Sequence, residues 1–132
     1  MLNHFSACSM LLVFTLSACG GEDTETVEPK LSVIQEKIFT PSCAFSSCHD
    51  AVGPENELDL SGANTYSSLM DGASPDTDVA RVVAGDPDQS LLYLSLVGEA
   101  PAGIRAMPLG NSLSEAEISA IKTWIQDGAL NN

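Results

Sequence analysis

Residues 43–49 read Cys-Ala-Phe-Ser-Ser-Cys-His, a heptapeptide that sets two thiols and an imidazole close together in the chain. Just upstream, apolar residues at positions 31, 34, 38 and 39 follow the three-and-four spacing of one helix face. This spacing predicts a helix over 31–39. Because Pro41 cannot continue that helix, we expect Cys43 to lie where the helix ends.

Two cysteines followed directly by a histidine are the residues that covalent attachment of haem requires. The two sulfur atoms add across the vinyl groups of the porphyrin, and the adjacent histidine reaches the iron from one face. The usual motif has two residues between the cysteines, whereas this chain has four, which makes the signature less distinctive. Because the added residues can bulge outward without moving either sulfur, we predict that Cys43, Cys48 and His49 hold one covalent c-type haem.

A thioether in the second axial position of a haem iron favours the ferrous state and raises the reduction potential. Met107 is the predicted ligand, 58 residues after His49, in a loop that Pro108 keeps out of helix. Met70 is the competing candidate, although it falls on a predicted helix among apolar neighbours. Either methionine could also be simple core filler. The sequence favours Met107.

The cysteine pair has two other interpretations. Export would place Cys43 and Cys48 where disulfides persist, and a bond between them would close a small loop that constrains little of the chain. Zinc could take both thiolates and His49, but no fourth ligand stands at a normal spacing.

The N-terminal residues predict export. Residues 10–18 form an apolar run that ends in small residues and is too short to span a bilayer. Residues 16–19, Leu-Ser-Ala-Cys, resemble the lipobox of bacterial lipoproteins, which implies a lipoprotein signal peptide over 1–18 and a lipid on Cys19. An ordinary signal peptide cut near Ala18 is the alternative, because the first nine residues contain no Lys or Arg.

Residues 19–30 are polar and acidic, and we expect them to form a disordered tether between the lipid and the domain. No Asp directly follows Cys19. By resemblance to lipoprotein sorting, this points to the outer membrane of the bacterial cell envelope, with the domain facing the periplasm or the cell surface.

The charge of the chain excludes one class of partner. Asp and Glu number 18 against 5 Lys and Arg, which gives a formal net charge of −13, and all of these charges follow Cys19. Without a basic patch to release phosphate counterions, nucleic acid is not expected as a partner. The acidity keeps an exported protein soluble, and it would also attract a basic redox partner.

Two helices are predicted in the middle of the chain. Residues 63–70 carry a weak helical pattern that Gly72 would end. Asp86, Pro87 and Gln89 are typical of a helix start, with Asp86 as the cap, and this helix would run to Val97.

The last predicted helix has the clearest signals. Ser114 and Glu117 form a capping box, apolar residues at 118, 121, 124 and 125 share one face, and Gly128 would end the helix. Loops rich in Gly, Pro, Asp and Asn separate the helices, at 50–62, 72–78 and 99–111. No segment alternates strongly enough to predict a sheet. The expected fold class is all-α, in one domain over 31–132.

Several stretches together resemble the monohaem class I cytochrome c domain of exported bacterial lipoproteins, of planctomycete and myxobacterial type. They are residues 38–43, Cys48-His49, 58–60, 85–93, 107–110 and 113–129. The resemblance covers about 31–130. It implies a small helical bundle with long loops around one haem, in which the first and last helices cross and Phe39 meets Trp124. It also implies His49 and Met107 as axial ligands, and Cys43 and Cys48 as the thioether pair.

With both axial positions filled by protein, the iron has no free site for a substrate. We therefore expect outer-sphere single-electron transfer with a redox partner protein. The chain has no nucleophile with a placed base and no Gly-rich phosphate loop, so an electron carrier is expected and not an enzyme. Two alternatives stay open: Met107 dissociates and the haem binds a small ligand, or a haem-free lipoprotein stapled by a disulfide acts as an interaction module.

Overall fold

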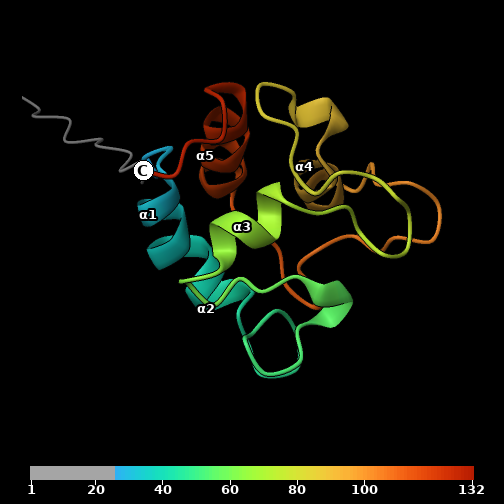
Figure 1. The fold of residues 1–132 in the computed structure, drawn as a ribbon. Helices are drawn as coiled ribbons and strands as arrows, with labels where there is room; N and C mark the ends of the chain where they lie inside the picture. Colours follow the sequence, from blue (N-terminus) through green and yellow to red (C-terminus); the bar gives the residue numbers. More distant parts are fainter. Residues whose placement is uncertain (1–25) are drawn as a thin grey trace, which may run out of the picture.

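The computed structural model describes residues 26–132, which form short helices joined by long loops (Figure 1). The helical elements are α1 (Leu31–Ile34), the π-helical turn η1 (Gln35–Phe39), α2 (Thr40–Ser42), the 3-10 turn η2 (Glu55–Glu57), α3 (Thr65–Met70), the 3-10 turn η3 (Pro87–Gln89), α4 (Leu91–Val97) and α5 (Glu115–Gln126). Between residues 26 and 132 there is no β-strand, only one isolated antiparallel bridge between Ala73 and Ala80. The prediction of a helical fold is confirmed. The predicted signal peptide, Cys19 and most of the tether lie outside the described residues.

The first helical stretch runs continuously from α1 through η1 to α2, so it ends three residues later than the predicted Phe39. Pro41 has no N–H to donate to the carbonyl of residue 37, and its ring would crowd that carbonyl. The helix widens instead, and the Thr40 N–H bonds to the carbonyl of Gln35, five residues back. The helix therefore ends at Ser42, and Cys43 follows directly, as expected.

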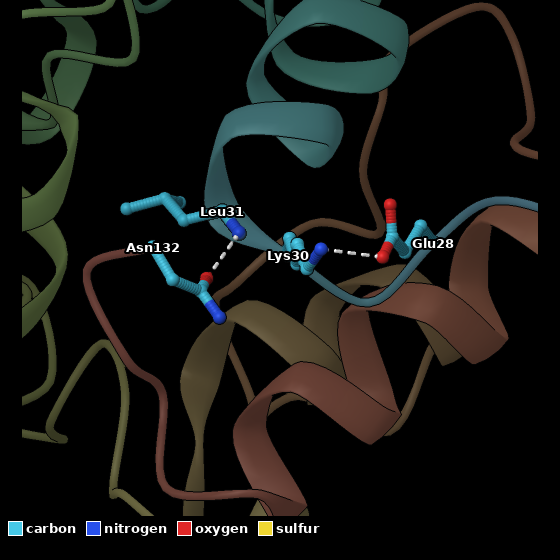
Figure 2. A network of polar contacts seen from close by, with 4 residues as sticks. All are labelled: Glu28, Lys30, Leu31 and Asn132. Carbon is cyan, nitrogen blue, oxygen red and sulfur yellow. Dashed lines mark hydrogen bonds and ion pairs between the residues drawn. The ribbon is translucent and has the colours of Figure 1, made fainter.

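Asn132 caps the start of α1. The first N–H groups of a helix have no partner within it, and Lys30 provides no side-chain cap here. The Asn132 side-chain oxygen accepts from the Leu31 N–H at 2.9 Å (Figure 2), and the Asn132 backbone carbonyl accepts from the Ser32 N–H at 2.9 Å. Figure 2 also shows the ion pair of Lys30 with Glu28, at 2.6 Å, which lies on the surface and contributes little.

The core forms where the first helical stretch meets α5, which lies beside α1 in Figure 1. Ile34 and Ile38 from the first stretch and Ile121 and Ile125 from α5 are completely buried. Phe39 and Trp124 are each 1% exposed and belong to the same hydrophobic cluster. The Trp124 indole N–H donates to the Leu130 carbonyl at 2.8 Å. The first and last helices thus share one core, with both aromatic rings inside it.

The start of α4 differs from the prediction. Asp86 makes no side-chain capping bond, Pro87–Gln89 forms a separate 3-10 turn, and α4 begins at Leu91. Ser90 separates the two elements because its backbone is extended (φ −98°, ψ 114°). Its hydroxyl accepts from the Val83 N–H at 2.8 Å and donates to the Asp86 carbonyl at 2.7 Å. The predicted cap at Asp86 is therefore wrong, and Ser90 is the residue that fixes this corner.

The other two helices follow the sequence signals closely. In α5, the Ser114 hydroxyl accepts from the Glu117 N–H at 3.3 Å, and the Glu117 carboxylate accepts from the Ser114 N–H at 2.7 Å. This confirms the predicted capping box. Gly128 follows the helix with φ of 100°, a conformation that favours glycine at a helix end. Helix α3 begins at Thr65, two residues after the predicted start at Ala63.

Candidate functional site

A cavity with an empty volume of about 750 Å³, including the part that opens to solvent, lies against the core. Most of its wall is apolar and comes from distant parts of the chain, including Phe39, Leu58, Leu60, Leu92, Leu96 and Ile121. The cavity therefore has the lining of a site for a largely apolar group.

Three of the four residues predicted to bind haem line this cavity: Cys43, His49 and Met107. The fourth, Cys48, is half-buried beside His49 but does not belong to the lining. Met70, the competing ligand candidate, is absent from the lining and packs against the hydrophobic core. The structure thus brings Met107 to the same cavity as His49 across 58 residues of sequence.

The loop between the cysteines folds back on itself. The Cys43 N–H donates to the Phe39 carbonyl at 2.9 Å, which holds Cys43 against the end of the helix, and the His49 N–H donates to the Cys43 carbonyl at 3.2 Å. Of the residues between the two cysteines, 45–47 are exposed and Ala44 is half-buried against the core. The wide spacing of the motif is therefore taken up by an outward bulge, while its two ends stay together.

The imidazole of His49 has a defined orientation. Its Nδ1 lies 3.2 Å from the carbonyl oxygen of Leu58, and the His49 carbonyl accepts from the Leu60 N–H at 2.8 Å. Since a carbonyl can only accept, a neutral His49 carries its proton on Nδ1 and keeps the lone pair on Nε2. A metal-binding histidine typically makes this second hydrogen bond, which fixes the ring and its tautomer.

Met107 lies on the loop between α4 and α5. Its N–H donates to the carbonyl of Ser95 at 2.9 Å, so the loop is held against α4 at this point. Ser95 is buried and also lines the cavity. The backbone therefore positions the Met107 side chain at the cavity wall without any bond from the thioether itself.

The thiol of Cys43 is poorly suited to carry a charge. Burial raises the pKa of this thiol to about 11, and the neighbouring Cys48 and Glu117 raise it further. At neutral pH the thiol is protonated, and the thiolate is the form that acts as a nucleophile or binds zinc. A thioether carries no charge, so this half-buried position suits an alkylated sulfur. Cys43 and Cys48 are both free thiols in the structure.

No family model, no curated protein and no solved structure matches this chain.

Across residues 26–132, none of the helices has both the length and the apolar character needed to cross a bilayer. In the same part of the chain, no three side chains among His, Cys, Asp and Glu are grouped so that they could share a metal ion.

One part of the cavity wall is polar and was not predicted from the sequence. Arg81 and Ser74 are both buried and both line the cavity. A signal was present, because Arg81 stands between Val79-Ala80 and Val82-Val83, where a charged side chain interrupts an apolar run. An arginine is seldom buried unless its side chain is paired with other groups.

Proposed function

We propose that this chain is a cytochrome c-like electron-transfer protein, with one covalent haem in the cavity. The observation that carries the proposal is that Cys43, His49 and Met107, from two distant segments, line one apolar cavity. The helical fold, and a core shared by the first and last helices, are compatible with a cytochrome c-like bundle.

The residues present fit a haem group in three ways. The cavity has a mostly apolar wall, as a porphyrin ring requires. His49 has its Nδ1 engaged with Leu58, which leaves Nε2 free to bind iron. Cys43 is half-buried with a raised pKa, and the uncharged thioether formed by attachment suits that position. Cys48, next to His49, would make the second attachment from the rim.

When bound, haem would supply a reversible one-electron couple. The chain's own contribution is the environment of that couple. His49 and Met107 would hold the axial positions, and the thioether of Met107 would favour the reduced form. The apolar side chains of the cavity would shield the group from water. With His49 and Met107 both holding the group, exchange of electrons with a partner would require only contact near the cavity and no substrate site.

The location and partner in this proposal depend on the N-terminal sequence. A lipid on Cys19 would keep the domain at the bacterial cell envelope, at the outer membrane, and residues 19–30 would give it reach toward a redox partner protein. The acidic composition, with a net charge of −13, favours a partner with a basic surface.

A redox titration of the full chain, produced with a cytochrome c maturation system, tests this function. We expect a red protein that passes reversibly between two states with the slope of a one-electron couple. We also expect the ferrous spectrum to be unchanged by carbon monoxide, because Met107 keeps the sixth position occupied. A spectrum that shifts readily with carbon monoxide would overturn electron transfer in favour of ligand binding, and a colourless protein would overturn both.

A further inference from the structure

Arg81 is a buried cation on the wall of the cavity. Its side chain is 8% exposed. One terminal nitrogen, Nη1, donates to the Ser68 carbonyl at 2.9 Å, and the other, Nη2, donates to the Asn56 carbonyl at 2.7 Å. A guanidinium has five N–H donors and stays protonated at any physiological pH. Two neutral carbonyls therefore satisfy part of its hydrogen bonding and none of its charge.

No carboxylate of the described residues balances this charge. The ion pairs found between residues 26 and 132 are Lys30 with Glu28 and Lys37 with Glu36, both at the surface. This absence is unexpected in a chain with 18 acidic residues. Since an uncompensated buried charge is strongly destabilising, the position of Arg81 is explained if an anion enters the cavity with the ligand.

Ser74 lies on the same side of the chain as Arg81. The Ala73–Ala80 bridge is flanked by two hydrogen bonds, from the Arg81 N–H to the Gly72 carbonyl at 3.2 Å and from the Ser74 N–H to the Val79 carbonyl at 3.0 Å. In such an antiparallel pair, side chains alternate between the two faces, so the side chains of Ser74 and Arg81 project from the same face. Both residues are buried and both line the cavity.

Gly72 makes room for the guanidinium. A Cβ atom at this position would lie 2.7 Å from Nη1 of Arg81, closer than real Cβ atoms come to a neighbour. The lack of a side chain at Gly72 lets the Arg81 guanidinium come close to the backbone at this position. The surrounding backbone therefore fixes the position of the Arg81 side chain.

We infer that Arg81 and Ser74 bind a carboxylate of the group that occupies the cavity. This inference rests on the proposed function, under which the carboxylate is a haem propionate. A planar guanidinium fork matches a carboxylate in shape and charge, and a serine hydroxyl adds one further donor. The rest of the wall is mostly apolar, so this corner orients the ligand: its acid edge lies toward Arg81 and its apolar body lies along the leucines.

A purely structural role is the competing explanation. Ser68 lies in the last turn of α3 and Asn56 in η2, so Arg81 also ties these two elements together. If this were its whole role, replacing Arg81 would lower stability and leave the ionisation of the ligand's carboxylates unchanged. The two explanations therefore differ in a property of the haem itself.

The test is a carbon-13 NMR titration of the haem propionates in the matured full chain, with the propionate carboxyls labelled. In the wild-type protein we expect one propionate to remain ionised down to about pH 4, because a nearby opposite charge lowers a carboxyl pKa by about one to three units. In Arg81→Gln the acid dissociation constant of that propionate should fall by about 10-fold to 1,000-fold. Ser74→Ala should shift it in the same direction by less.

Arg105→Gln is the matched control. It removes the same charge from an exposed side chain that does not line the cavity, so it should leave both propionates as in the wild type. The inference is overturned if a red Arg81→Gln protein titrates like the wild type, or if Arg105→Gln causes the same shift. Should Arg81→Gln fail to fold, the wild-type and Ser74→Ala titrations decide: two propionates with ordinary, identical pKa values overturn the inference. A protein without haem overturns the proposed function instead, and this inference with it.

Discussion

Replacing Ser90 with alanine is expected to loosen the wall of the cavity and lower the stability of the domain. Ser90 is completely buried, and its hydroxyl bonds to the Val83 N–H and the Asp86 carbonyl just before α4. Helix α4 contributes Leu92, Ser95 and other residues to the cavity wall. The hydrogen bonds of Ser90 therefore fix the position of this part of the wall. Alanine fits the same space but leaves the Val83 N–H without a partner.

The expected cost follows from that one unsatisfied group. A buried donor left without an acceptor costs about 1 to 3 kcal/mol, and we expect about 1 to 2 kcal/mol here because the Asp86 carbonyl belongs to an exposed residue and can bond to water. In a domain of this size that corresponds to a fall in melting temperature of roughly 5 to 15 °C.

Thermal unfolding followed by circular dichroism measures this effect on the haem-loaded protein. Ser112→Ala is the control, because Ser112 is exposed and lies outside the cavity lining. It should melt with the wild type. If Ser90→Ala also melts within about 1 °C of the wild type, the assignment of Ser90 as the residue that fixes this corner is wrong.

Three other perturbations have defined outcomes. Met107→Ala should lower the reduction potential and remove the sulfur-to-iron charge-transfer absorption, whereas Met70→Ala should change stability alone; the reverse pattern in redox titrations would move the ligand to Met70. Asn132→Ala should lower the free energy of unfolding by about 1 kcal/mol in urea, since it removes the side-chain cap of α1, while the exposed Asn131→Ala should leave it unchanged. The pKa of Asp59 is lowered, first by the hydrogen bond from Ser61 and then by that from Asn64. Its ionised form therefore stabilises the fold above about pH 4, and the stability advantage of wild type over Asp59→Asn should disappear as the pH falls below that value; an advantage that persists at lower pH would contradict this account.

The sequence predicted the parts of this fold that local chemistry determines. The capping box of α5 needs only Ser114 and Glu117 at the right spacing, and both bonds form. The helix before Cys43 could be read from its apolar spacing. Its extension to Ser42 could not, because that depends on how the backbone widens around Pro41.

The errors arose where a distant or non-repeating contact decides the structure. Asp86 has the sequence features of a helix cap, but the buried Ser90 takes the bonds at that corner. Arg81 was missed because its role depends on a hairpin that turns it toward the cavity. The candidate haem-binding residues were predicted from their types and spacing, whereas the presence of Met107 and His49 in one cavity wall depends on the path of the long loops between them.

A pyridine haemochrome spectrum of the denatured full chain, after maturation, tests the central claim most directly. Its absorption maximum depends on how many vinyl groups of the haem have been converted to thioethers. We expect the spectrum of a haem with two thioether bonds, which remains with the polypeptide through acid extraction and is lost in the double variant Cys43→Ser with Cys48→Ser. A polypeptide that yields no haemochrome, with Cys43 and Cys48 joined in a disulfide, would contradict the account.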